Sequence, residues 1–344
     1  MRHPKVRDLL TIARRTWRAI TAGAVILNYH RVADLESDPW GVAVSRQHFS
    51  EHLEVIRRLG LAVRLKDLVE AHRRRRMPRR SVVLTFDDGY LDSLRDAKPC
   101  LERAGIPATF YVTTARFAAR REYWWDELEW LLLRPGTLPS VLRLTIRGET
   151  KLIELAGAAD YSETDWRRDR SVRVWEARPG TRLSFYMQVH AALKQLQHPE
   201  QQAALDAIAE WSGATPPVRS THLTLDADEV VELAGGNAID IGAHTRTHTD
   251  LSNCDPALQE REIAGAKESL QEILGSVIES FAYPYGTFGP ESAEIVRRAG
   301  FTNACAMIKT SVRSSSHPYL LPRIGVPDCD GDAFERLLRR SFQS

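Results

Sequence analysis

The sequence predicts an α/β fold, in which a parallel, barrel-like sheet is interrupted by a largely helical insertion. Three observations support this prediction. Short apolar runs typical of buried strands alternate with segments of helical spacing, in roughly six or seven strand–helix units. Several of these runs end in polar residues, as expected at the carboxyl ends of parallel strands. The alternation is lost at about residues 116–220, where long helical patterns replace it.

The composition indicates a globular protein with one large domain or two ordinary ones. The 344 residues are 43% hydrophobic, and a net charge of +2 gives no sign of a nucleic-acid partner. The four cysteines lie far apart without a metal-ribbon pattern, which fits a reducing compartment.

Residues 1–23 are expected to form a basic helical segment that packs on the domain or rests on a membrane surface. Arg14, Arg15 and Arg18 interrupt its apolar residues, so we see no signal peptide. No apolar run reaches the ~18 residues needed to cross a bilayer. We therefore expect a cytoplasmic protein, with peripheral membrane contact left open, and a barrel domain at 24–344.

Before the insertion, the pattern predicts a strand–helix–strand unit preceded by one further strand and two helices. The strands are expected at 24–30, 81–86 and 108–112, and the helices at 49–59, 65–71 and 91–104. Gly60 and Gly105 follow two of these helices, as glycine often does at helix ends.

Within the insertion, residues 123–133 and 184–211 have long helical patterns, and 142–146 alternate in polarity. The first helix carries Trp124, Trp125 and Trp130. These rings could line a sugar site, but Leu128 and Leu131 at helical spacing favour core packing.

After the insertion, strands and helices alternate again. Strands are predicted at 239–243, 302–307 and 321–326, with a strand end at 281–286, and helices at 226–234, 256–274, 291–299 and 334–340.

Two adjacent carboxylates, Asp87 and Asp88, follow the strand at 81–86 directly, and Gly89 allows the chain to turn after them. Neighbouring side chains of an extended chain point to different sides. One carboxylate can therefore bind a cation while the other faces a reacting atom. The alternative is a pair of turn-forming or helix-capping aspartates.

A histidine pair gives the second motif. His244 and His248 follow the strand at 239–243 and are four residues apart, so a helical turn would direct both imidazoles at one ion. Two histidines and one carboxylate, with open positions for water, form a catalytic metal site of the zinc type. His30 and Tyr285 also follow strand-like runs and are expected at the same rim.

These motifs resemble those of the polysaccharide deacetylases, family four of the carbohydrate esterases. The run Thr85-Phe-Asp-Asp-Gly89 is similar to the first family motif, His244-Thr-Arg-Thr-His248 to the second, and Tyr283-Pro-Tyr-Gly286 to the end of the third. The resemblance covers about residues 24–115 and 222–327.

The resemblance implies a distorted (β/α) barrel and metal-dependent removal of acetyl groups from N-acetylated sugars. By position, Asp88, His244 and His248 would hold one divalent ion, with Zn²⁺ preferred. Asp87 would act as the general base toward the attacking water, and the backbone N–H of Tyr285 would help to hold the oxyanion.

The chain departs from the family pattern in two places. Ala282 stands where the third motif usually has an arginine that tethers the catalytic aspartate, and the usual Leu-x-His near the C-terminus is missing. Arg323 or Arg31 would replace the tether, and we expect the Arg323 guanidinium within ~3 Å of Asp87.

The missing Leu-x-His also leaves the general acid to be supplied elsewhere. Tyr29-His30 is similar to the early strand end that takes this role in family members acting on biofilm polymers, so His30 is the candidate acid. His317 is a weaker candidate.

The sequence thus predicts a hydrolase that removes N-acetyl groups from N-acetylhexosamine units of a glycan or glycan precursor, for example in exopolysaccharide biosynthesis. Two alternatives stay open. The first is release of another acyl group, such as formyl, from a lipid-linked amino sugar. The second is a glycan-binding protein without activity.

Overall fold

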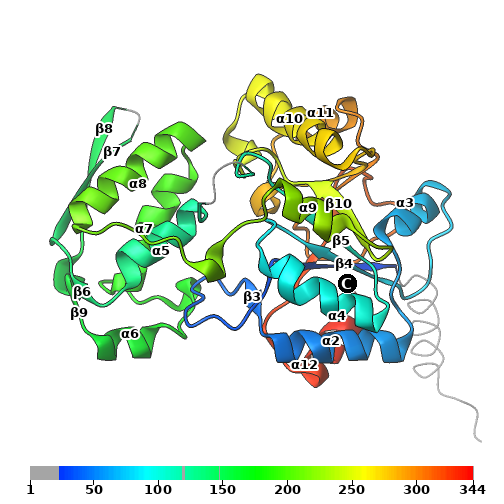
Figure 1. Cartoon of the computed structure of the whole chain (residues 1–344), viewed down its shortest axis with the longest axis horizontal. Coiled ribbons are helices and arrows are strands. Elements are labelled where there is room, and N and C mark those ends of the chain that lie inside the picture. The colour runs from blue at the N-terminus through cyan, green and yellow to red at the C-terminus, as the bar shows by residue number, and fades with distance from the viewer. Residues whose placement is uncertain (1–22, 118–120, 147, 344) are drawn as a thin grey trace, which may run out of the picture.

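The computed structural model describes residues 23–117, 121–146 and 148–343, so nearly all of the expected segment 1–23 lies outside the described residues. Parallel strands form a nearly closed barrel (Figure 1). In spatial order the strands are β13 (Leu321–Pro322), β12 (Asn303–Ala306), β11 (Ser280–Ala282), β10 (Ile239–Ala243), β5 (Ala108–Val112), β4 (Val82–Phe86), β1 (Val25–Tyr29) and β14 (Ile324–Gly325). The predicted parallel α/β barrel is confirmed.

The single strand predicted at 321–326 is wrong in one respect, because Arg323 divides it into β13 and β14. β13 pairs with β12, and β14 pairs with β1 at the other end of the sheet. The segment therefore changes its neighbour at Arg323 and joins the two ends of the sheet. The Arg323 N–H still donates to the Ala306 carbonyl at 3.1 Å.

Residues of the central strands alternate between two cores. β1 and β4 pair in register from Val25↔Val82 onward. Val25 and Leu27 face the larger core between sheet and helices, whereas Ile26 belongs to a smaller cluster that fills the barrel. Both faces of these strands are buried, which explains their continuous apolar sequence.

Helices cover the outside of the barrel. α2 (Arg46–Leu59), α4 (Lys98–Ala104) and α12 (Gly331–Ser341) lie together on one side, and α10 (Pro256–Leu274) and α11 (Ser292–Arg298) lie on the opposite side (Figure 1). Among the described residues, the remaining α-helices of the barrel are α3 (Leu65–Arg73) and α9 (Ala227–Ala234).

Two predicted helices are not single regular α-helices. The helix expected at 91–104 begins with a π-helical turn, Ser93–Ala97, because Pro99 has no N–H to donate to the carbonyl four residues earlier. The helix expected at 184–211 is divided into α7 (Arg182–Lys194) and α8 (His198–Ser212), with Pro199 in the first turn of α8.

The segment between β5 and β10 has a hydrophobic core of its own. It contains α5 (Trp124–Leu133), α6 (Glu163–Asp169), α7 and α8, and the hairpin of β7 (Val141–Ile146) and β8 (Glu149–Glu154). A short ladder joins β6 (Gly136–Thr137) to β9 (Asp160–Tyr161). In Figure 1 this segment projects to one side of the barrel. The domain boundaries at 116 and 220 stay a prediction.

The loop after β1 links this insertion to the barrel. The loop includes the paired strands β2 (Arg31–Val32) and β3 (Ala43–Val44). Trp40, within it, donates from Nε1 to the hydroxyl of Tyr186 on α7 at 2.8 Å. In the described part of the chain, no helix has the length and apolar character that crossing a bilayer requires.

Candidate metal centre and catalytic site

The turn after β4 separates the two adjacent carboxylates. Asp88 and Gly89 both have left-handed backbone conformations, with φ of 73° and 79°. A Cβ atom at Gly89 would lie 2.9 Å from a methyl group of Val112, so glycine is required at this position. The turn gives Asp87 and Asp88 different partners, as the sequence predicted.

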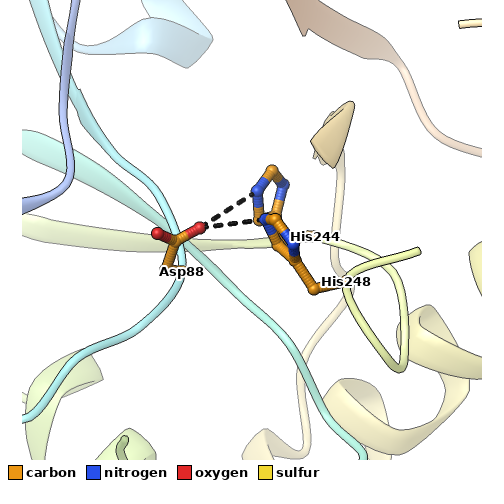
Figure 2. A group of neighbouring side chains, drawn as sticks. All are labelled: Asp88, His244 and His248. Atoms are coloured by element: carbon orange, nitrogen blue, oxygen red, sulfur yellow. Dashed lines mark ion pairs between the residues drawn. The ribbon is translucent and has the colours of Figure 1, made fainter. Parts of the chain in front are cut away.

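Asp88 and the two histidines lie together at the carboxyl ends of β4 and β10. The Asp88 Oδ1 atom is 3.5 Å from His244 Nε2 and 3.2 Å from His248 Nε2. One possible ligand atom from each residue lies within 4.8 Å of the others, and all three residues are buried. Figure 2 shows the carboxylate directed at both imidazole rings. Burial raises the pKa of Asp88, but its interactions with the two imidazoles outweigh this effect and hold it well below 3.8.

The local structure predicted for the histidine pair is wrong, since residues 244–248 form a bent loop and not a helical turn. Thr245 and His248 have φ of 62° and 60°, and these two left-handed residues bring the second imidazole back toward the first. The spacing of the two histidines correctly indicated that they share one site, but a loop, and not a helix, brings their imidazoles together.

Glu262 of α10 holds this loop from one side. Its carboxylate accepts hydrogen bonds from the backbone N–H groups of Arg246 and Thr247, both at 2.9 Å, and from the Thr247 hydroxyl at 3.0 Å. On the other side, the Arg246 carbonyl accepts from the N–H groups of Thr114 and Ala115. The backbone between the two histidines is therefore fixed before any ion binds.

The three side chains fit a divalent metal ion. His244 Nδ1 lies 2.8 Å from the carbonyl oxygen of Ala282, so this nitrogen carries the proton and Nε2 is free to bind a metal. His248 Nδ1 is buried without a hydrogen-bond partner in the described part of the chain. Two imidazole nitrogens and one carboxylate oxygen are a ligand set typical of catalytic zinc.

Asp87 is held by Arg323, at the break between β13 and β14. The two terminal guanidinium nitrogens each lie 2.7 Å from one carboxylate oxygen, and both side chains are buried. The predicted contact is present. Burial raises the pKa of Asp87, but the charge of Arg323 outweighs this effect and keeps it below 3.8.

The alternative tether, Arg31, has other partners. Its Nε donates to the Asp92 carboxylate at 2.9 Å, and its guanidinium lies 4.2 Å from the centre of the Tyr90 ring. Arg31 therefore buttresses the loop after β4, and Arg323 alone of the two candidates contacts Asp87.

Backbone strain is concentrated at this site. Six non-glycine residues in the described part of the chain have positive φ, and four of them lie here: Asp88, Thr245, His248 and Tyr285. Such conformations cost on the order of 1–3 kcal/mol each and persist where surrounding contacts enforce them. Tyr285, at φ 59°, lies in the short 3₁₀ turn Pro284–Gly286 that follows β11.

A cavity of about 430 Å³ joins the predicted residues. Its lining includes His30, Asp87, Asp88, His244, His248 and Tyr285. A larger hollow of about 1,240 Å³ lies at the opposite, amino-terminal ends of the strands and contains no predicted site residue. His317 is exposed in the segment leading into β13, outside the 430 Å³ cavity, which argues against it as the acid.

Three features of the site were missed by the sequence analysis. Trp125 was assigned to core packing, but it lines the cavity and its ring centre is 4.7 Å from that of His248. Glu262 is a buried charge on the helix face that also carries Ile263 and Ala266, a signal that could have revealed it. The Ala282 carbonyl orients His244 through the backbone, so no side-chain pattern could reveal it.

The family model described as Polysaccharide deacetylase matches residues 74–135 and 184–304, which is more than half of the chain. The match extends into both ends of the insertion, where the resemblance noted from the motifs stopped. No curated protein matches the chain.

Solved structures with the same fold include deacetylases. The deacetylase PplD of Streptococcus pyogenes, solved in complex with acetate, is 16% identical with a TM-score of 0.57, over 93% of this chain and 99% of that one. IcaB from Ammonifex degensii is 19% identical with a TM-score of 0.56, over 94% and 98%. A de-N-acetylase from Aggregatibacter actinomycetemcomitans is 14% identical with a TM-score of 0.52, over 92% and 99%. At these identities the likeness shows the fold.

Proposed function

The chain belongs to the polysaccharide deacetylase family, and we propose that it is a metal-dependent hydrolase that removes the N-acetyl group from N-acetylhexosamine units of a glycan or glycan precursor. One observation carries this proposal. A carboxylate held by a buried arginine, Asp87, lies beside a buried metal-type triad in the same cavity. An ion pair with a purely structural role would not need the triad of Asp88, His244 and His248 beside it.

We assign the metal-ligand role to Asp88, His244 and His248, with Zn²⁺ as the proposed ion. An ion bound there would polarise the amide carbonyl and lower the pKa of water. The His244 tautomer set by the Ala282 carbonyl supports this assignment, because it leaves Nε2 as the ligand atom.

Asp87 is the proposed general base. It is ionised near neutral pH, because Arg323 keeps its pKa low, and it can accept a proton from the attacking water. Arg323 uses both carboxylate oxygens, which restrains Asp87 from rotating onto the ion. The remaining lone pairs of these oxygens stay available toward the cavity.

The oxyanion and the leaving group have separate proposed partners. The backbone N–H of Tyr285 is the proposed donor to the oxyanion, and one such donor contributes roughly 3 kcal/mol in comparable enzymes. His30, at the end of β1, lines the cavity together with Asp87 and is the proposed acid for the departing amine. Acid and base would then act from neighbouring strands, β1 and β4.

Product analysis tests the proposal. Purified protein would be loaded with Zn²⁺ and incubated with N-acetylglucosamine oligomers of one to six units and with lipid-linked acylated amino sugars. Release of acetate with an equal amount of free amine is expected, and the Asp87→Asn protein is the control. Release of formate alone from a lipid-linked formamido sugar would favour the alternative deacylase. Binding without hydrolysis of any substrate would contradict the proposal.

A further inference from the structure

Lys194 is the last residue of α7 in the insertion, and its side chain lines the catalytic cavity. A cation at the C-terminal end of a helix is favourable by itself, because the helix dipole places partial negative charge there. Lys194 nevertheless makes two further contacts, one with Tyr285 and one with Asp250, and both partners belong to the barrel. Lys194 lies outside the three motifs, and the proposed reaction gives it no role.

The first contact of Lys194 is with the ring of Tyr285. The Lys194 Nζ atom lies 4.1 Å from the ring centre, within the distance at which an ammonium group is attracted to an aromatic face. His248 packs against the same ring, with centroids 4.6 Å apart and ring planes at 73°. The Tyr285 ring is therefore contacted both by a proposed metal ligand and by a cation from the insertion.

The second contact of Lys194 is with the carboxylate of Asp250. The Lys194 Nζ atom lies 3.6 Å from Asp250 Oδ2, and 30% of the lysine side chain but only 7% of the aspartate side chain is exposed. Asp250 Oδ1 accepts a hydrogen bond from the Thr287 hydroxyl at 2.7 Å. Thr287 directly follows the turn Pro284–Gly286. Lys194 is thus connected to this turn in two ways, through the Tyr285 ring and through Asp250.

The turn holds a backbone conformation that a non-glycine residue rarely adopts. Tyr285 has φ of 59° and ψ of 1°, and such left-handed residues persist where surrounding contacts enforce them. The Gly286 N–H donates to the Tyr283 carbonyl at 2.9 Å, which closes the turn on itself. The position of the turn relative to the cavity depends on its outside contacts, and Lys194 takes part in two of them.

We propose that Lys194 is a positioning residue for the oxyanion donor. By holding the ring of Tyr285 and the carboxylate of Asp250, it fixes the direction of the Tyr285 N–H. This inference rests on the proposed function for the role of that N–H. A donor stabilises the transition state more than the bound substrate when its direction is set before the charge develops. The insertion then belongs to the catalytic machinery.

Two other roles of Lys194 predict different results. A direct contact with the substrate would already be present in the bound substrate, so its loss would raise KM. An ion pair that only joins the insertion to the barrel would change thermal stability and leave kcat unchanged. Because Lys194 is partly exposed, the contribution of such a pair to stability is expected to be small.

Steady-state kinetics separate these roles. The full chain, loaded with Zn²⁺, would be assayed on an N-acetylglucosamine pentamer. Lys194→Met keeps the length of the side chain but removes its charge, and it is expected to lower kcat roughly tenfold and to change KM less than about twofold. Lys194→Arg can still stack on the ring and pair with the carboxylate, so its kcat should stay within about threefold of the wild type. A higher KM with unchanged kcat in Lys194→Met would overturn the inference.

The matched control is Lys267→Met on α10. Lys267 also makes a cation–π contact, with Phe301 at 4.6 Å, but it does not line the cavity. This variant should leave kcat and KM unchanged, and thermal melting would verify that each protein is folded. Should Lys194→Met unfold, Thr287→Val takes its place, because it removes the hydroxyl bonded to Asp250, and a fall in kcat at constant KM is again expected. Equal kinetics of the test and control variants would contradict the proposed role.

The Tyr285 N–H can also be followed without turnover. The chain has nine tyrosines, so protein labelled with ¹⁵N-tyrosine has a small set of amide signals, and Tyr285→Phe identifies the one of interest. Lys194→Met should shift this signal, whereas Lys267→Met should not. An unshifted signal in Lys194→Met would overturn the inference whatever the activity. A shifted signal in a protein whose wild type releases no acetate would refute the proposed function and leave the link between Lys194 and Tyr285 intact.

Discussion

Arg323 and Asp87 form a buried, two-pronged ion pair, with both nitrogen–oxygen distances at 2.7 Å. The arginine comes from the point where the chain passes from β13 to β14, whereas the family resemblance led us to look for a tether at the position of Ala282. Arg323 therefore makes the contact with Asp87 that we had expected of an arginine at that position. Arg323 divides the last strand into β13 and β14 and also orients the carboxylate of Asp87, so one residue accounts for both features.

Replacing Arg323 by lysine is expected to reduce turnover about tenfold or more. Lysine keeps the charge but cannot donate two parallel hydrogen bonds to one carboxylate, and a hydrogen bond to a charged group is worth about 1.5–3 kcal/mol. Steady-state kinetics with acetate detection would measure the change, and metal content should stay that of the wild type.

Arg297→Lys on α11 is the matched control, because Arg297 makes an exposed two-pronged pair with Glu294. It should change neither turnover nor stability by more than about 0.5 kcal/mol. Full activity of Arg323→Lys would show that Asp87 needs no planar partner.

Asp87→Asn is expected to keep the bound metal and lose turnover by a factor of roughly 10² or more. Asparagine has nearly the same shape but cannot accept the proton of the attacking water. Metal analysis and kinetics on the same preparation separate the two roles of the neighbouring aspartates. Loss of metal from this variant would mean that Asp87 is itself a ligand.

His30→Gln tests the general acid with two leaving groups. An amine must be protonated as it departs, whereas the nitrophenolate of p-nitrophenyl acetate leaves without a proton. The variant should therefore lose at least tenfold more activity on the N-acetylated sugar than on the ester. Equal losses on both, or a protein that no longer folds, would favour a structural role for this histidine.

Glu262→Gln is expected to weaken metal binding by roughly tenfold. The carboxylate holds the backbone N–H groups of Arg246 and Thr247, and groups that orient metal ligands typically contribute factors of 10–100 in affinity. Competition with a zinc chelator measures the affinity directly. The exposed Glu268→Gln on the same helix is the control, and equal affinities of both variants would remove Glu262 from the site.

The sequence predicted the barrel and the members of the site because both depend on local pattern. A continuous apolar run that ends in Asp87 and Asp88 is readable as a buried parallel strand with its functional end. The same holds for Arg323, which follows an apolar run late in the chain. Strand ends in a parallel barrel meet at one rim, so the order of elements was enough to bring these residues together.

The rest of the site depends on backbone geometry that spacing does not encode. The left-handed conformations of Thr245 and His248 cannot be inferred from an HxxxH spacing, which a helix would satisfy equally well. The Ala282 carbonyl acts through the main chain, and Trp125, on α5 of the insertion, lies beside His248 only in the folded chain. These contacts join residues that are far apart in the sequence, so a local sequence pattern does not encode them.

Metal content tests the central claim most directly. The wild-type protein, purified without chelator and analysed for elements, should contain one divalent ion per chain, with Zn²⁺ expected. His244→Ala, which removes one of the three ligands, should contain much less, and its hydrolytic activity should fall in parallel. The account predicts this joint loss. Equal metal content in the wild type and in His244→Ala would contradict it.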